Sequence, residues 1–307
     1  MLSRTAASLY WIGRYMERAE FTTRLVEATI RLAALGGHDH VEQAWASALS
    51  VVRAPPLDTG KEGYAARRFL ALSPDNPSSI RTCIVAARDN ARAARTALTR
   101  EGWEAINRAW LMIQARTSPG SVQATLSLVE ELKAELRGFE GALARMLRNE
   151  GYWFMRLGSM IERGDSTARL LDVKYYLLLT EGQEVGGALD RDQWQTILQI
   201  VSAKTAYRHL YRDALKPWGV ADMLIFRREL PRSLAWTAEE TVGLLGEFGA
   251  RSGRQGPADR RARERLSTLQ ELDVSTIFRR GLHEWLQAYV RENNAIGDAI
   301  AAQFRFG

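Results

Sequence analysis

The sequence has 307 residues, of which 46% are hydrophobic and 25% charged, a balance that excludes a disordered chain and is typical of a globular protein. Its formal net charge of +6 is modest for this length, so charge alone does not predict a nucleic-acid-binding protein. The single cysteine, Cys83, excludes an internal disulfide and a cysteine-based metal site.

Helix-forming residues and helical periodicity dominate the whole chain, and eight prolines leave room for long helices. In the first half we expect helices over residues 4–33, 42–53, 62–72, 79–100, 102–116 and 121–148. In the second half we expect them over 151–180, 190–213, 219–229, 232–248 and 258–304, with a break or kink at Pro231. The sequence therefore predicts an all-α fold, a helical bundle.

The first helix of each predicted half carries the same charged pattern. At an offset of 145 residues, GRYMERAEFTTRLVE, which begins at Gly13, aligns with GSMIERGDSTARLLD, which begins at Gly158. Self-similarity of this kind is the sequence signature of a repeat. We therefore predict two internally duplicated halves, about 1–148 and 151–304.

Two further blocks extend the predicted duplication. At an offset of 149, WASALSVV from Trp45 aligns with WQTILQIV from Trp194. At an offset of 140, PSSIRTCIVAARDNAR aligns with PWGVADMLIFRRELPR, which places Arg92 opposite Arg232. The three offsets differ by a few residues, as changes in loop length would produce. Because no flexible joint separates the halves, we expect them to pack as one unit, a single domain over residues 1–307.

A polar stripe runs along the repeated helix beside its apolar face. Its members are spaced by four, three, four and three residues, and are Gly13, Glu17, Glu20, Arg24 and Glu27 in the first copy and Gly158, Glu162, Asp165, Arg169 and Asp172 in the second. On a solvated surface, ion pairs of this spacing such as Glu20–Arg24 and Arg24–Glu27 are worth a few tenths of a kcal/mol each and tolerate exchange of Arg for Lys. The stripe keeps its central Glu and its Arg in both copies.

This identity favours a partly buried charge network, in which a guanidinium needs a bidentate carboxylate and loss of one partner costs about 3–5 kcal/mol. Arg18 and Arg163 point about 100° away from the stripe and are expected to bridge to another helix. Arg92 and Arg232 are the expected additions to the network. Two roles stay open for it: a purely structural one, or one that also binds a zwitterionic or peptide-like ligand.

No catalytic or metal-binding motif accompanies the stripe. None of the four histidines lies three residues after a glutamate, as in di-iron bundles, and the HDH sequence at 38–40 is expected to be a polar turn. Phosphate-binding loops, nucleophile elbows and C-x-x-C are missing from the sequence, and Cys83 is expected in the core. We predict no metal and no cofactor. Glu17 and Glu162 remain candidate acid/base groups without a nucleophile beside them.

The sequence shows no membrane or secretion signal. The N-terminus becomes charged within four residues, and YYLLLT at 175–180 is too short to cross a bilayer, so we expect a cytoplasmic protein. The arginine-rich run at 251–266 reads as a solvated loop that leads into a helix, and no nucleic-acid-binding motif accompanies it.

The chain resembles the bacterial alpha-E family, a predicted α-helical domain named for its ER motif. The resemblance rests on YWIGRYMERAEFTTRL, RLGSMIERGDSTARLLDVKYY, ARDNAR and LPRSL, and it covers nearly the whole chain. The ER motif maps onto Glu17 and Arg18, and again onto Glu162 and Arg163. The resemblance implies a partnership with circularly permuted ATP-grasp ligases and transglutaminase-like peptidases, in a setting proposed to form or modify amide bonds.

Three functions are carried forward from the sequence. The first is a non-catalytic helical module that binds a peptide or amino-acid substrate or docks on an ATP-grasp ligase. In the second, the chain is an enzyme of amide chemistry with Glu17 and Glu162 as acid/base groups. The third is a basic nucleic-acid binder that uses the run from Arg251 to Arg265.

Overall fold

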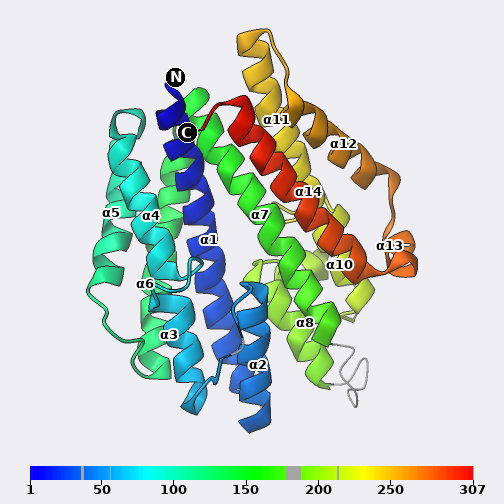
Figure 1. Ribbon diagram of the computed structural model, residues 1–307. Coiled ribbons are helices and arrows are strands. Elements are labelled where there is room, and N and C mark those ends of the chain that lie inside the picture. Colours follow the sequence, from blue (N-terminus) through cyan, green and yellow to red (C-terminus); the bar gives the residue numbers. More distant parts are fainter. Residues whose placement is uncertain (36–37, 56, 178–187, 213, 307) are drawn as a thin grey trace. The chain divides into compact units, whose positions relative to one another are not determined.

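The computed structural model describes residues 1–35, 38–55, 57–177, 188–212 and 214–306, with the side chains of residues 38, 39, 174–177, 188 and 189 left aside. Throughout this part of the chain the regular structure consists of α-helices joined by short turns and two 3₁₀ segments (Figure 1). The all-α prediction is confirmed.

The chain divides into two compact units. Unit 1 comprises Met1–Glu162 together with Phe304–Gly307, and unit 2 comprises Arg163–Gln303. The boundary between the two units falls inside helix α7 (Glu150–Leu177). The two units are therefore described one at a time.

Unit 1 is built on a long N-terminal helix. Its elements are α1 (Ser3–Ala33), α2 (His38–Val51), η1 (Lys61–Gly63), α3 (Tyr64–Leu72), α4 (Ile80–Ala93), η2 (Arg95–Ala97), α5 (Arg100–Gln114), α6 (Val122–Ala144) and the first part of α7. Helices α1, α4, α5 and α6 pack in a closed cycle, each against the next. Their shared core is apolar, with Ile84, Ile106 and Leu132 fully buried. This bundle holds α1 in place along its length.

Side-chain caps fix where several unit 1 helices begin. Ser79 and Thr99 accept hydrogen bonds from backbone N–H groups in the first turns of α4 and α5, and Ser121 does the same for α6. Each cap satisfies a donor that the helix itself leaves unpaired and is worth about 1 kcal/mol. The short polar segments between the predicted helices thus act as helix starts.

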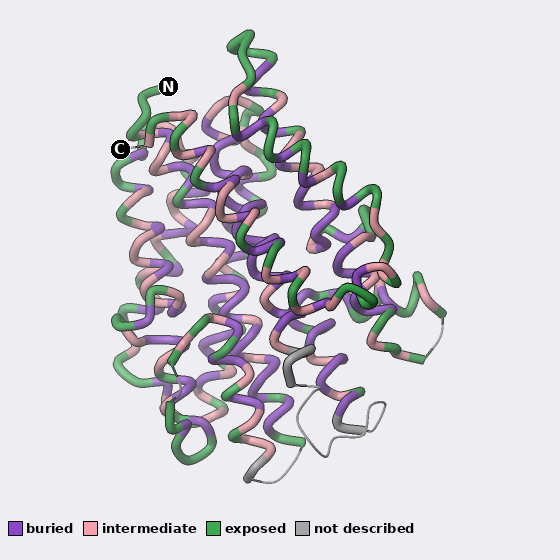
Figure 2. Tube along the Cα trace, turned by 45° about the vertical axis from the view of Figure 1, so that its right-hand side comes forward, coloured by how far each residue is buried: buried purple, intermediate pink, exposed green. Residues whose placement is uncertain are grey.

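Unit 2 begins with the second part of α7. Its further elements are α8 (Ala188–Ile200), α9 (Lys204–Tyr211), α10 (Pro217–Phe226), α11 (Leu234–Ser252), α12 (Pro257–Glu271), α13 (Val274–Arg280) and α14 (Leu282–Gln303). Helix α12 packs against both α11 and α14. Buried residues alternate with intermediate and exposed ones along the helices, and exposed residues are frequent in the connections (Figure 2).

Several predicted helices end earlier than expected. The helix predicted over 258–304 is three helices, because Asp273 caps α13 through the backbone N–H of Thr276 and Gly281 turns the chain with a φ of +97°. The helix predicted over 190–213 is divided between α8 and α9 near Ser202, which has a φ of +57°. Pro231 lies between α10 and α11, as predicted.

The sequence HDH is not the polar turn expected from it, because α2 already begins at His38. The preceding GG pair at 36–37, like residues 178–180 of the helix predicted over 151–180, lies outside the described residues. Within the described ranges no helix combines the length and hydropathy that a membrane span requires.

Candidate functional site

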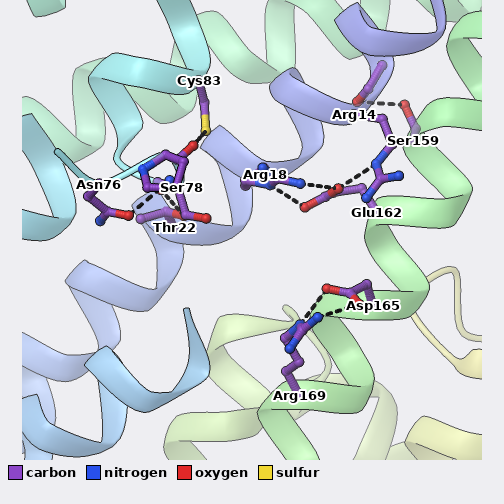
Figure 3. Close-up of polar contacts among 12 residues, drawn as sticks. Arg14, Arg18, Thr22, Asn76, Ser78, Cys83, Ser159, Glu162, Asp165 and Arg169 are labelled. Carbon is purple, nitrogen blue, oxygen red and sulfur yellow. Dashed lines mark hydrogen bonds and ion pairs between the residues drawn. The ribbon is translucent and has the colours of Figure 1, made fainter. Parts of the chain in front are cut away.

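One buried carboxylate gathers two arginines in unit 1. Glu162 on α7 accepts a hydrogen bond from Nε of Arg14 at 2.7 Å, through its Oε2. Arg18 binds the same carboxylate twice, with Nε 2.5 Å from Oε1 and Nη2 2.9 Å from Oε2 (Figure 3). The Glu162 side chain is 3% exposed, so these charge-assisted bonds form out of water. Glu162, Arg14 and Arg18 are called the Glu162 cluster below.

Two glycines let α1 and α7 approach closely enough for this contact. A Cβ atom on Gly13 would lie 2.0 Å from the carbonyl oxygen of Met155, and one on Gly158 would lie 2.0 Å from that of Tyr10. Any larger residue would push the helices apart, because real Cβ atoms do not approach so closely. Ser159 adds a hydrogen bond from its Oγ to the carbonyl oxygen of Gly13 at 3.3 Å. The glycines at the head of each predicted stripe are therefore contact points of the helix crossing.

The arginines set the ionisation of the cluster. Burial alone would raise the pKa of Glu162, but Arg18 and Arg14 lower that pKa to about 2. For Arg14, burial opposes the charge and the carboxylate more than offsets it, so its pKa is raised. The pKa of Arg18 is raised as well, chiefly by Glu162. The cluster thus holds one carboxylate and two guanidinium groups, all charged throughout the physiological pH range.

Aromatic rings surround the two guanidinium groups. Arg14 lies 5.4 Å from the ring of Trp11 and donates to the hydroxyl of Tyr10 at 3.3 Å, and Arg18 lies 6.0 Å from the ring of Tyr15. Trp11 and Tyr15 stack with their centroids 5.4 Å apart. Trp11 is 36% exposed, whereas Glu162 behind it is buried. One turn of α1 therefore presents an aromatic surface that is backed by the Glu162 cluster.

Cys83 is a core residue, as predicted. Its side chain is fully buried and its Sγ donates to the carbonyl oxygen of Pro77 at 3.7 Å. Burial raises the pKa of the Cys83 thiol to about 12, so the thiolate that a nucleophile requires does not form at neutral pH.

The predicted stripes on α1 and α7 each contain an ion pair along their own helix. Arg24 binds Glu20 in unit 1 at 2.8 Å, with side-chain exposures of 16% and 10%. In unit 2, Arg169 binds Asp165 through two bonds of 2.5 and 2.9 Å, with side-chain exposures of 17% and 11%. The four-residue spacing along each helix predicts these pairs. Their side chains are much less exposed than those of ordinary surface ion pairs.

The far ends of the stripe make different contacts in the two units. In unit 1, Glu27 binds Lys133 on α6 at 2.7 Å and Arg31 at 2.8 Å. Burial acts to raise the pKa of Glu27, but these two cations lower it. In unit 2, Asp172 accepts hydrogen bonds from Nδ1 of His283, at 2.6 Å, and from the side-chain amide of Gln287, both on α14. Both carboxylates tie their helix to a neighbouring one.

The remaining ER-motif residues are buried too. The exposed fractions are 5% for Glu17 and 4% for Arg163. Within unit 2, Arg163 donates from Nη1 to the carbonyl oxygen of Pro231 at 3.2 Å and stands 5.6 Å from the ring of Trp236. Both residues thus lie in the packed interior of their units.

The contacts of two threonines disagree with the alignment at an offset of 140 residues. Thr22 donates to the carbonyl oxygen of Ser78, directly before the cap of α4, and Thr167 donates to that of Arg232, directly before the cap of α11. Ser78 and Arg232 therefore take the same place relative to their threonines. The offset of 140, which paired Arg92 with Arg232, is wrong for this block.

Arg92 is not brought to the predicted network. It sits in the last turn of α4 with an exposed side chain, and no hydrogen bond or ion pair of Arg92 is found in the part of the chain that the structure describes. Arg232 is half-buried, and its backbone carbonyl accepts a hydrogen bond from Thr167 on α7. The arginine-rich run at 251–266 is also divided, because Arg251 and Arg254 are exposed whereas Arg265 is 6% exposed.

Sequence reasoning missed Arg14. The search for a duplicated site compared residues at an offset of 145, and the counterpart of Arg14 there is Ser159. Because an arginine stands at only one of the two aligned positions, the comparison of the two segments did not single out Arg14. The available signal was the spacing of Arg14 and Arg18, which places both guanidinium groups on one side of α1. Over the residues with described side chains, no group of three or more His, Cys, Asp and Glu residues gathers as metal ligands.

The comparison with known families decides the identity of the domain. Residues 1–304 match the family Alpha-E, described as a predicted alpha-helical domain with a conserved ER motif. The chain belongs to the Alpha-E family. In this Alpha-E domain, the Glu-Arg pair occurs on α1 as Glu17–Arg18 and on α7 as Glu162–Arg163.

Relatives of this Alpha-E domain occur in longer proteins. An uncharacterized protein of Mycobacterium bovis is 23% identical over 280 residues, which cover 83% of this chain and 31% of that protein. An uncharacterized protein of Mycobacterium tuberculosis is 22% identical over the same shares of the two chains. The chain thus spans about a third of the length of these relatives, in which the matched region is joined to further sequence. No solved structure matches the chain.

Proposed function

We propose that this Alpha-E domain is a non-catalytic helical module that acts with an ATP-grasp ligase in forming or modifying amide bonds. The Glu162 cluster is its scaffold, and the surface of Trp11 and Tyr15 is its docking face for the ligase or its peptide-like substrate. A transglutaminase-like protein is the second expected member of this system. The ligase partnership comes from the family resemblance, and the following observations support the role of a module.

The state of Glu162 carries the proposal. A general base or acid works best when its pKa is near the working pH, whereas the pKa of Glu162 is lowered to about 2. Both of its oxygen atoms already hold guanidinium groups, so neither is oriented toward a reacting proton. The arrangement suits a rigid support. It therefore favours the module over an enzyme that uses Glu162 for acid/base chemistry.

The aromatic surface over the cluster suits a docking role. Tryptophan, tyrosine and arginine are the residues in which binding energy concentrates at protein interfaces. Here Trp11 and Tyr15 stack on one another, and the arginines behind them are fixed by Glu162. Binding would therefore cost little side-chain entropy. The covalent linkage of the matched region to further sequence in the mycobacterial relatives is consistent with a domain that works beside others.

Reconstitution with an ATP-grasp ligase of the class that the family resemblance implies tests the proposal. We expect the two proteins to form a complex that increases amino-acid-dependent ADP release. Trp11→Ala should weaken the complex about tenfold or more, as for an interface hot spot. Leu111→Ala is the matched control, because Leu111 is an exposed apolar residue on α5, 54% exposed, and its loss should leave affinity unchanged.

Two results would overturn the proposal. One is the absence of a complex and of any effect on ADP release. The other is amide turnover by the purified chain alone that Glu17→Gln abolishes while the helical circular dichroism is retained, which would establish the enzyme.

A further inference from the structure

A second group of polar side chains lies in the interior of unit 2, apart from the Glu162 cluster. It joins four helices: Gly164 on α7, Thr237 on α11, Arg265 on α12, and Tyr289 and Asn293 on α14. Asn293 is fully buried, and the exposed fractions of Thr237, Tyr289 and Arg265 are 1%, 5% and 6%. These residues are called the Arg265 cluster.

The charge of Arg265 is unmatched. Its Nη1 donates to Oδ1 of Asn293 at 2.5 Å, and its guanidinium lies 5.4 Å from the ring of Tyr289. No ion pair joins Arg265 to a carboxylate among the residues that the structure describes, and its buried Nε has no acceptor there. A buried cation with neutral neighbours alone is costly, because desolvation is not repaid by an opposite charge.

A second buried arginine shows how such a charge is otherwise accommodated. Arg67 in unit 1 is 2% exposed. Its Nη1 donates to the carbonyl oxygen of Gly120 at 3.0 Å and to Oγ1 of Thr125 at 2.7 Å, and its Nε donates to the carbonyl oxygen of Glu62. Arg67 thus organises loops through carbonyl and hydroxyl groups, whereas Arg265 keeps an unused donor.

A second unused donor lies beside Arg265. The hydroxyl of Tyr289 is buried and has no hydrogen-bond partner among the described residues. A Cβ atom on Gly164 would lie 3.1 Å from this hydroxyl, 3.3 Å from Oγ1 of Thr237 and 3.5 Å from Oδ1 of Asn293. The polar atoms therefore converge on Gly164, a position of α7 that carries no side chain.

The corresponding bundle of unit 1 shows that four packed helices need no such cluster. Between α1, α4, α5 and α6 the core is apolar, and Ile84, Ile106 and Leu132 are all fully buried. Well-packed apolar residues are generally as stable as buried charged ones or more stable. The stability gained by packing therefore does not explain why the Arg265 cluster is polar.

We propose that the Arg265 cluster binds a small monovalent anion, of the size of a halide or formate. The guanidinium supplies the single positive charge, and Nε of Arg265 and the hydroxyl of Tyr289 supply donors in a low-dielectric interior. A cation is repelled by Arg265. A divalent oxyanion such as sulfate would bury a second negative charge without compensation.

The test uses the full chain in buffer with neither halide nor carboxylate. Sodium formate and sodium bromide are titrated separately against sodium sulfate at equal ionic strength, with binding followed by calorimetry and by the bromide NMR line width. We expect saturable binding of bromide, formate or both, and none of sulfate. Selectivity between bromide and formate identifies the anion as a halide or a carboxylate.

Three variants locate the binding. Tyr289→Phe removes one donor and should weaken binding about tenfold, the effect of one hydrogen bond to a charged group. Arg265→Met and Gly164→Ala should abolish it. Tyr64→Phe, at a tyrosine that is 41% exposed, is the matched control and should bind as the parent chain does. Binding of no anion beyond the sulfate reference, or equal binding by a folded Arg265→Met or Tyr289→Phe variant, would overturn the proposal.

Discussion

Replacement of Glu162 by glutamine tests the scaffold with the smallest change in shape. The amide keeps the volume of the side chain but loses the negative charge that Arg14 and Arg18 share. It also turns an N–H group toward guanidinium donors, because a glutamine side chain has only one acceptor oxygen. Two guanidinium groups, whose side chains are only 12% and 22% exposed, would then be left beside a neutral amide.

Two estimates of the stability that Glu162→Gln should lose agree with one another. Removal of one partner from a buried ion pair costs about 3–5 kcal/mol. The pKa of Glu162 is lowered from 4.5 to about 2, and at about 1.4 kcal/mol for each pKa unit this corresponds to about 3 kcal/mol of stability. Since the folded-state pKa lies below the unfolded-state value, this stability is present above pH 4.5 and is lost as the pH falls toward 2.

Urea unfolding followed by circular dichroism measures the effect. At pH 7 we expect Glu162→Gln to lose about 3–5 kcal/mol relative to the parent chain, and we expect the difference to shrink between pH 4.5 and 2. Glu104→Gln is the control, because Glu104 pairs with Arg100 at the surface and its replacement should leave the stability nearly unchanged. A loss below about 1 kcal/mol in Glu162→Gln, or a loss independent of pH, would refute the reasoning.

Three further predictions concern other parts of the structure. In urea unfolding, Gly13→Ala should destabilise the chain by about 1–3 kcal/mol or more, because the new Cβ would clash with the backbone of Met155. Gly138→Ala is the control: no atom lies within 4 Å of its new Cβ, and it should stabilise the chain by about 0.5–1 kcal/mol. Arg169→Lys should cost more than about 0.5 kcal/mol in the same assay, since lysine cannot reproduce the bidentate contact, and a smaller loss would indicate a solvated pair. Because burial raises the pKa of Cys83 to about 12, iodoacetamide at pH 8 should modify its thiol only after unfolding, and rapid modification of the native chain would contradict this burial.

Periodicity and helix signals in the sequence were sufficient to predict the fold class and the long N-terminal helix. The predicted range 4–33 corresponds to α1, Ser3–Ala33. Breaks inside polar periodic segments were missed, because a helix pattern on both sides of Gly281 conceals the one residue that turns the chain. The prediction of an internal duplication stays a prediction, although Gly13 and Gly158 make reciprocal contacts at the offset of 145.

The candidate site was only partly predictable. Spacing along one helix indicated the pairs Glu20–Arg24 and Asp165–Arg169, since residues four apart always face each other on a helix. The contacts of Glu162 could not be derived in this way, because they depend on the angle and distance at which α1 crosses α7. Ligand binding and partnership remain proposals.

The ionisation of Glu162 is the most direct test of its role as a scaffold. Carboxyl ¹³C NMR of the labelled chain, with the resonance assigned by its loss in Glu162→Gln, can follow the group as the pH is lowered from 7. The account predicts that Glu162 stays ionised until the pH approaches 2, its pKa being held down by Arg14 and Arg18. Titration near the ordinary value of 4.5 or above, while the chain remains folded, would contradict it.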